Sequence, residues 1–163
     1  MKRTSRNQAA ALALLLATGF AHAQNTQCIE LTTQAETLEE YVNEQGQKAT
    51  RLVAVGKAVP GAQIVWTITA KNVCTTPADD VVIANEVPAE MTYVADSAMG
   101  VGTNITHSLD NKEFKPAESL VVRNSDGSSR PARAEDIRAI RWTYQAPFGP
   151  GASAFVRYRA IVK

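Results

Sequence analysis

The sequence is poor in the side chains that metal sites and many active sites use. It contains only two histidines and two cysteines in 163 residues. A structural zinc site takes four Cys or His ligands, and His107 is isolated from both cysteines in the sequence. Neither cysteine has a histidine or basic partner in a motif that would lower its thiol pKa. The sequence therefore predicts no metal site, no cofactor site and no catalytic residues.

An excess of charge of either sign is also lacking. The 17 basic and 16 acidic residues give a formal net charge of +1. Three of the basic residues lie in residues 1–23, so residues 24–163 carry 14 basic and 16 acidic side chains. Binding to a nucleic-acid backbone requires a dense basic patch that releases counterions, and no such patch is present. The sequence thus predicts no nucleic-acid partner.

Long apolar runs are absent beyond residue 23. Residues 1–23 have a basic start, an apolar run from Ala9 to Gly19 and the small residues Ala21 and Ala23 around a cleavage point. This order is typical of a secretory signal peptide cut before Gln24. A retained anchor is the alternative, but the apolar run is short for a bilayer span. We expect an exported protein of the periplasm or cell surface, with no transmembrane segment after signal removal.

The two cysteines, Cys28 and Cys74, both lie after the predicted cleavage point. Export implies an oxidising compartment, where such a pair usually forms a disulfide. We therefore predict a Cys28–Cys74 bond, and the sequence leaves open whether it forms within one chain or between two. Cys28 lies five residues beyond Ala23, which disfavours lipid attachment at this cysteine.

Short runs of alternating apolar and polar residues dominate the rest of the chain. Ile64, Trp66 and Ile68 alternate with Val65 and two threonines, so we expect the isoleucines and Trp66 to face a core. A second run, 81–83, follows a turn and stops at a proline. Eight to ten such segments, separated by turn residues and without a long helix, predict an all-β sandwich. We expect residues 24–58 (N-terminal strands and hairpin) and 59–163 (sandwich core) to form one domain.

The segment 37–44 permits two interpretations. Thr37 followed by Glu40 matches a capping box and would start a short helix. Alternatively, residues 38–43 and 50–55 are the two arms of a β-hairpin that turns at 45–47, where Gly46 lies. We favour the hairpin because residues 51–55 are strongly strand-like. Farther along the chain, residues 133–137 suggest a single helical turn.

Three patterns that resemble functional sites are better explained as ordinary turns and strand residues. The glycines of residues 97–102 could cradle a phosphate, but a strand-like run follows them instead of a helix. The Asp- and Asn-containing turns at 110–112 and 124–128 lack the spacing of known calcium loops. Adjacent carboxylates would point to opposite faces of a strand and make poor acid–base pairs, as at Glu39 with Glu40 and Glu135 with Asp136.

An ordered series of motifs resembles the DUF11 family, a conserved-repeat domain of bacterial and archaeal surface proteins. The series comprises Val59–Gly61, Ile64–Thr69, Asn72, Ala78, Val81–Ile83, Val87–Pro88, Tyr93–Val94, Ser97, Ile140–Trp142 and Pro150–Ala160. The resemblance extends from about Leu31 to the C-terminus. The segments 102–106, 130–132 and 137–142 further resemble small, single-domain, exported members from Gram-negative bacteria.

The resemblance implies an immunoglobulin-like β-sandwich of two mainly antiparallel sheets at the cell surface. The chain departs from the larger repeat proteins at Asn85 and Val87, where Asp and Leu are usual, and this mild change leaves the expected fold intact. In the larger proteins the domain repeats as a stalk or adhesin module, whereas this chain has one copy. The family supplies no catalytic residues that could be transferred to this sequence.

These features favour a non-enzymatic structural or protein-interaction module with a protein partner or self-association, and no small-molecule substrate is evident. A second hypothesis is a filament subunit, in which the N-terminal strand of one copy completes a sheet of the next. Ile29, Leu31 and Thr33 would line that donated strand. An envelope hydrolase is the third hypothesis, disfavoured by the lack of a suitable acid–base pair.

Overall fold

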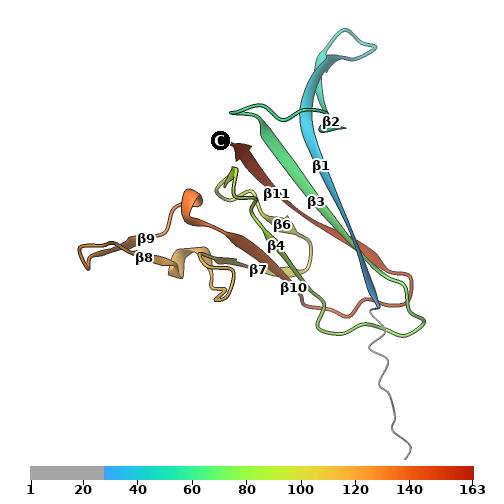
Figure 1. Cartoon of the computed structure of the whole chain (residues 1–163). Coiled ribbons are helices and arrows are strands. Elements are labelled where there is room, and N and C mark those ends of the chain that lie inside the picture. The colour runs from blue at the N-terminus through green and yellow to red at the C-terminus, as the bar shows by residue number, and fades with distance from the viewer. Residues whose placement is uncertain (1–27) are drawn as a thin grey trace, which may run out of the picture.

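The chain folds into an all-β structure in the computed structural model, which describes residues 28–163 (Figure 1). The predicted signal peptide, residues 1–23, lies outside the described residues. None of the helices in residues 28–163 is long and apolar enough to cross a membrane. The predicted fold class, an all-β sandwich of antiparallel sheets, is confirmed.

One sheet is large and entirely antiparallel. Its strand order is β2-β1-β3-β11-β5, and the two-residue strand β6 pairs with β11 beside β5. The strands are β1 (Ile29–Val42), β2 (Lys48–Ala54), β3 (Gln63–Asn72), β5 (Met91–Tyr93), β6 (Met99–Gly100) and β11 (Ser153–Val162). The β1–β2 hairpin extends beyond the body of the molecule (Figure 1). Its turn includes Gly46 with φ +76°, so the hairpin interpretation of residues 37–44 is confirmed.

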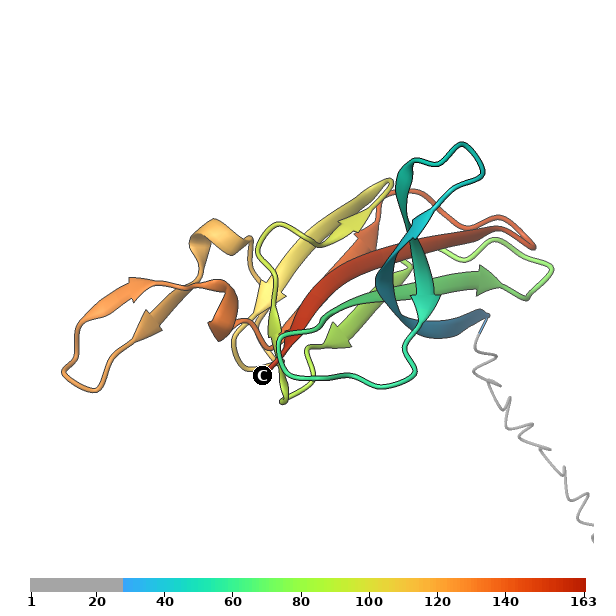
Figure 2. The same ribbon diagram turned by 90° about the horizontal axis from the view of Figure 1, so that it is seen from above.

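The second sheet is narrower and packs on one face of the first. It has the order β4-β10-β7, from β4 (Val82–Glu86), β10 (Ala139–Tyr144) and β7 (Thr103–Ser108). A hairpin of β8 (Val121–Arg123) and β9 (Ser129–Pro131) projects to one side, flanked by the 3-10 helices η1 (Ala117–Ser119) and η2 (Ala134–Asp136) (Figures 1 and 2). The predicted helical turn at 133–137 corresponds to η2.

Large side chains from both sheets fill the space between them. Trp142 of β10 and Tyr158 of β11 are fully buried, with ring centroids 6.2 Å apart. Each large apolar side chain removed from water contributes about 1.5 to 3 kcal/mol. Aliphatic side chains complete the core: Ile68, Ile83, Ile140 and Val156.

The predicted division of β3 into a core face and a solvent face is wrong in part. Ile64 and Ile68 are buried as expected, but Trp66 on the same face is only half-buried. Val65, on the opposite face, is just 4% exposed. The reason is that β3 lies centrally in the large sheet, and side chains of β1, β2 and β11 surround Val65 on this face: Leu38, Leu52, Arg157 and Arg159.

The predicted disulfide is confirmed and lies within one chain. Cys28 and Cys74 are bonded, with their Cα atoms 5.1 Å apart. Cys28 immediately precedes β1 and Cys74 follows β3, and the Val73 N–H also donates to the Cys28 carbonyl at 2.8 Å. The bond therefore fastens the start of β1 to the end of the strand with which it pairs.

Candidate functional site

The face of the large sheet that points away from the small sheet carries a groove. At one level of the sheet the register aligns Glu36 of β1, Val65 of β3 and Arg159 of β11. Successive side chains of a strand alternate between faces, so these three share the outer face. The groove measures about 360 Å³, and we call it the outer groove. Its lining residues are Leu38, Leu52, Val65, Asp96, Ser97, Met99, Arg157 and Arg159.

Apolar side chains in and beside this groove remain accessible to water. Val65 is buried in the floor, whereas Leu38 is 51% and Met99 46% exposed. Phe155 and Ile161 lie on the same face of β11 and are also exposed. Exposed apolar side chains that gather around a groove with polar groups at its edge are typical of a surface that binds another protein.

Two arginines give the outer groove a basic side. The Arg157 Nε–H donates to Thr67 Oγ1 at 2.9 Å, and that hydroxyl donates to Glu36 Oε2 at 3.3 Å. The Arg159 guanidinium makes no side-chain hydrogen bond or ion pair with any residue of 28–163. A guanidinium offers five N–H donors in a planar fork that matches a carboxylate. The groove is thus suited to a segment that combines apolar side chains with an acidic group.

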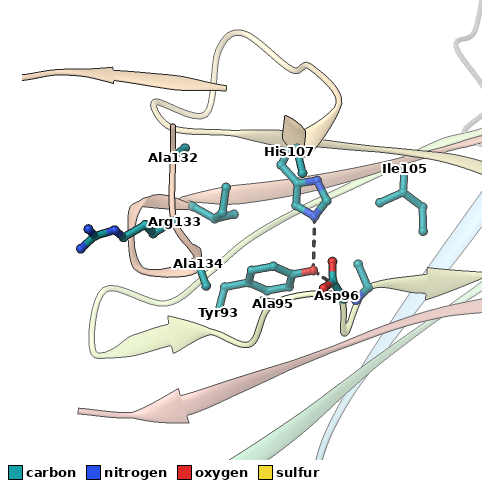
Figure 3. Close-up of a pocket in the computed structure, with 11 residues that line it drawn as sticks. Tyr93, Ala95, Asp96, Ile105, His107, Ala132, Arg133 and Ala134 are labelled. Atoms are coloured by element: carbon teal, nitrogen blue, oxygen red, sulfur yellow. Dashed lines mark hydrogen bonds between the residues drawn. The ribbon is translucent and has the colours of Figure 1, made fainter. Parts of the chain in front are cut away.

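A second hollow, of about 460 Å³, opens between the two sheets near β5 and β7 (Figure 3). Its wall consists mainly of small and apolar side chains, with Asp96 and Arg133 at the rim. Tyr93 of β5 and His107 of β7 face each other across it, with the Tyr93 hydroxyl 3.3 Å from His107 Nε2. The Ala98 N–H donates to the same hydroxyl at 3.2 Å. The complete lining is Tyr93, Ala95, Asp96, Ala98, Ile105, His107, Ala117, Ala132, Arg133, Ala134 and Ile137.

Burial favours the uncharged forms of Tyr93 and His107. It lowers the pKa of His107 from its usual 6.5, although the negative charges of Asp96 and Glu118 oppose the shift. It also raises the pKa of Tyr93. His107 Nδ1 is buried and has no partner among residues 28–163. The pair connects the two sheets by a hydrogen bond between neutral groups.

The carboxylate pairs considered in the sequence do not form acid–base sites. Glu39 and Glu40 point to opposite faces of β1, and Glu39 forms an ion pair with Arg51 at 2.6 Å. Asp136 accepts two hydrogen bonds from Arg130, which lower its pKa to about 2, so it stays ionised and cannot serve as an acid near neutrality. Within residues 28–163 no three His, Cys, Asp or Glu side chains gather as metal ligands.

The structure places the proposed donor residues in their own sheet. Ile29, Leu31 and Thr33 belong to β1 and pair with Asn72, Ala70 and Ile68 of β3. Donation of this strand to another copy would break that pairing next to the disulfide. Leu31 remains 49% exposed because the narrow second sheet does not cover β1.

Sequence reasoning missed the residues that form both hollows. The sequence patterns did not single out Arg157 or Arg159, and they showed His107 only as isolated from both cysteines. The alternation along β11 does place both arginines on one face, and this was the available signal. No local pattern indicates that Tyr93 and His107 meet, because they come from different sheets.

Comparison of the chain with protein-family models, with curated proteins and with solved structures gave no match.

Proposed function

We propose that this protein is an exported, non-enzymatic interaction module of the cell envelope, and that the outer groove binds a segment of a partner protein. The observation that carries the proposal is the combination of accessible apolar side chains in the groove, Leu38 and Met99, with the Arg159 guanidinium, which is unpaired within residues 28–163. We expect the partner segment to present apolar side chains and a carboxylate.

Three observations support export. Residues 1–23 have the order of a signal peptide. The Cys28–Cys74 bond agrees with an oxidising compartment such as the periplasm or the cell surface. The resemblance to the DUF11 family also supports a surface location, and it adds no catalytic role.

Site-specific photo-crosslinking in the native host tests the groove. A photoreactive amino acid replaces Met99 in the groove or, as the matched control, Ser125 in the exposed turn between β8 and β9. We expect a discrete crosslinked species from position 99 and none from position 125. Arg159→Glu should abolish that species, because it sets like charges against the expected carboxylate.

Two results contradict the proposal. One is the absence of any crosslink from position 99 in cells where the protein is exported and folded. The other is a crosslinked species that Arg159→Glu leaves unchanged. Cell fractionation of the same samples tests export separately, since the mature chain should leave the cytoplasm and lack residues 1–23.

A further inference from the structure

The first half of β1 has a free edge. On one side, Ile29–Thr37 pair with β3. On the other side, β2 pairs only with Glu36–Val42, and within residues 28–163 no strand lies beside Ile29–Ala35 there. Figure 1 shows β1 at the margin of the large sheet, with β2 alongside its upper part alone.

The hydrogen bonds on either side identify which backbone groups face this edge. The Ala35 carbonyl accepts from the Val55 N–H at 3.2 Å, so residue 35 points its backbone groups away from β3. The Cys28 carbonyl accepts from Val73, which follows β3, so residue 28 points the opposite way. In an antiparallel strand this direction alternates from residue to residue. Ile29, Leu31 and Thr33 therefore present their N–H and C=O groups to the free edge.

We propose that two copies of this protein pair through these edges, antiparallel, with a two-fold axis beside Leu31. In this register Leu31 lies opposite its own copy, and Ile29 lies opposite Thr33 in both directions. Residues that face each other in this way exchange two hydrogen bonds. Every outward backbone group of the three residues then gains a partner, and the large sheets join into one.

The side chains fit this register. The two Leu31 side chains meet at the axis and cover apolar surface that is otherwise half-exposed. On the other face Glu30 lies opposite Thr32 of the second copy, so no like charges stand directly opposite each other. The pairing is isologous and therefore closes at a dimer.

Apart from the charge of Glu30, the edge lacks the features that normally prevent such pairing. Protective edges carry charged side chains, especially lysine, or proline or a β-bulge. Residues 29–35 contain neither lysine nor proline, and their register with β3 runs without a bulge. The Cys28–Cys74 bond and β3 already hold this strand in place. Pairing with a second copy therefore costs little further conformational entropy. The edge is separate from the outer groove, and the inference does not depend on the proposed function.

The experiment is light scattering coupled to size-exclusion chromatography on oxidised protein of residues 24–163, over a wide range of concentration. Because the paired segment is short, we expect a dimer with a dissociation constant on the order of micromolar or weaker. Leu31→Lys should leave only monomer at concentrations where the wild type is dimeric, since two ammonium groups would meet at the axis. Val121→Lys changes an exposed side chain of β8 and is the matched control, which should remain dimeric.

Amide hydrogen exchange measured by NMR distinguishes this dimer from any other. The amides of Leu31 and Thr33 should exchange more slowly at high than at low protein concentration. The amides of Glu30 and Thr32 face β3 and should be protected at both. Protection of 31 and 33 that disappears in Leu31→Lys, while the unfolding midpoint stays unchanged, supports the inference.

Three outcomes overturn it. The first is a wild type that remains monomeric up to millimolar concentration. The second is a dimer that Leu31→Lys does not dissociate. The third is protection of the edge amides only when another envelope protein is added, which would assign the edge to a strand of a different partner.

Discussion

At the scale of single residues, His107 makes the stability of this protein depend on pH. It is the only histidine in residues 24–163 and is 8% exposed, and burial lowers its pKa below the usual 6.5. The unfolded chain therefore takes up a proton at a higher pH than the folded chain does. The contribution of neutral His107 to the unfolding free energy is thus fully present above about pH 6.5. It is lost as the pH decreases toward the folded-state pKa.

We expect the unfolding free energy of the wild type to decrease as the pH falls below about 6.5, with a slope of at most about 1.4 kcal/mol per pH unit from this one group. His107→Gln should remove this slope, because no other side chain of residues 24–163 has its usual pKa close to neutrality. Urea denaturation at a series of pH values measures the slope in the wild type and in the variant. A wild-type slope that persists in the variant would show that another group causes it.

At the scale of the strands, the close approach of β6 to β7, β10 and β11 depends on a glycine. A Cβ added at Gly100 would lie 2.8 Å from Thr103 Oγ1, 2.9 Å from Val156 Cγ1 and 3.1 Å from Trp142 Cδ1. Those side chains belong to both sheets, so β6 can lie beside β11 only if residue 100 has no side chain. Overpacking of a filled core typically costs 1 to 3 kcal/mol.

Gly100→Ala should accordingly lower the unfolding free energy by about 1 to 3 kcal/mol in urea denaturation. Gly56→Ala is the control, because a Cβ there meets nothing within 4 Å. It should be neutral or slightly stabilising, since alanine restricts the unfolded chain. Equal effects of the two substitutions would contradict the proposed tight approach.

At the scale of the whole molecule, the disulfide limits the freedom of the unfolded chain. It joins residues 46 positions apart and encloses β1, β2 and β3. In the chain-entropy model a loop of this length stabilises the folded state by about 3 to 4 kcal/mol. The small sheet lies outside this loop, and its strands gain from the bond only through the shared core.

Joint substitution of Cys28→Ser and Cys74→Ser should lower the unfolding free energy by about 3 to 4 kcal/mol. Urea denaturation of the wild type with a reductant should give the same midpoint as the double variant. A loss below about 1 kcal/mol would mean that the unfolded chain is already compact around this loop.

Much of the fold follows from local patterns. Alternation and turn residues predicted the all-β class, the hairpin that turns at 45–47 and the helical turn at 133–137, which is η2 (Ala134–Asp136). The disulfide partners followed from the presence of only two cysteines. The sequence did not show whether the bond forms within one chain or between two. The strand order could not be obtained, because an alternating strand is compatible with many neighbours.

The sequence by itself determined that this protein is all-β and where most of its strands lie, since periodicity and turn chemistry act between residues close in the chain. Only the tertiary structure decided how those strands are arranged. It placed β3 between β1 and β11, which buried Val65 as well as Ile64 and created the outer groove. It also brought Tyr93 to His107 and left one edge of β1 free. These features depend on contacts between residues distant in the chain, and such contacts are set by the packing of whole sheets.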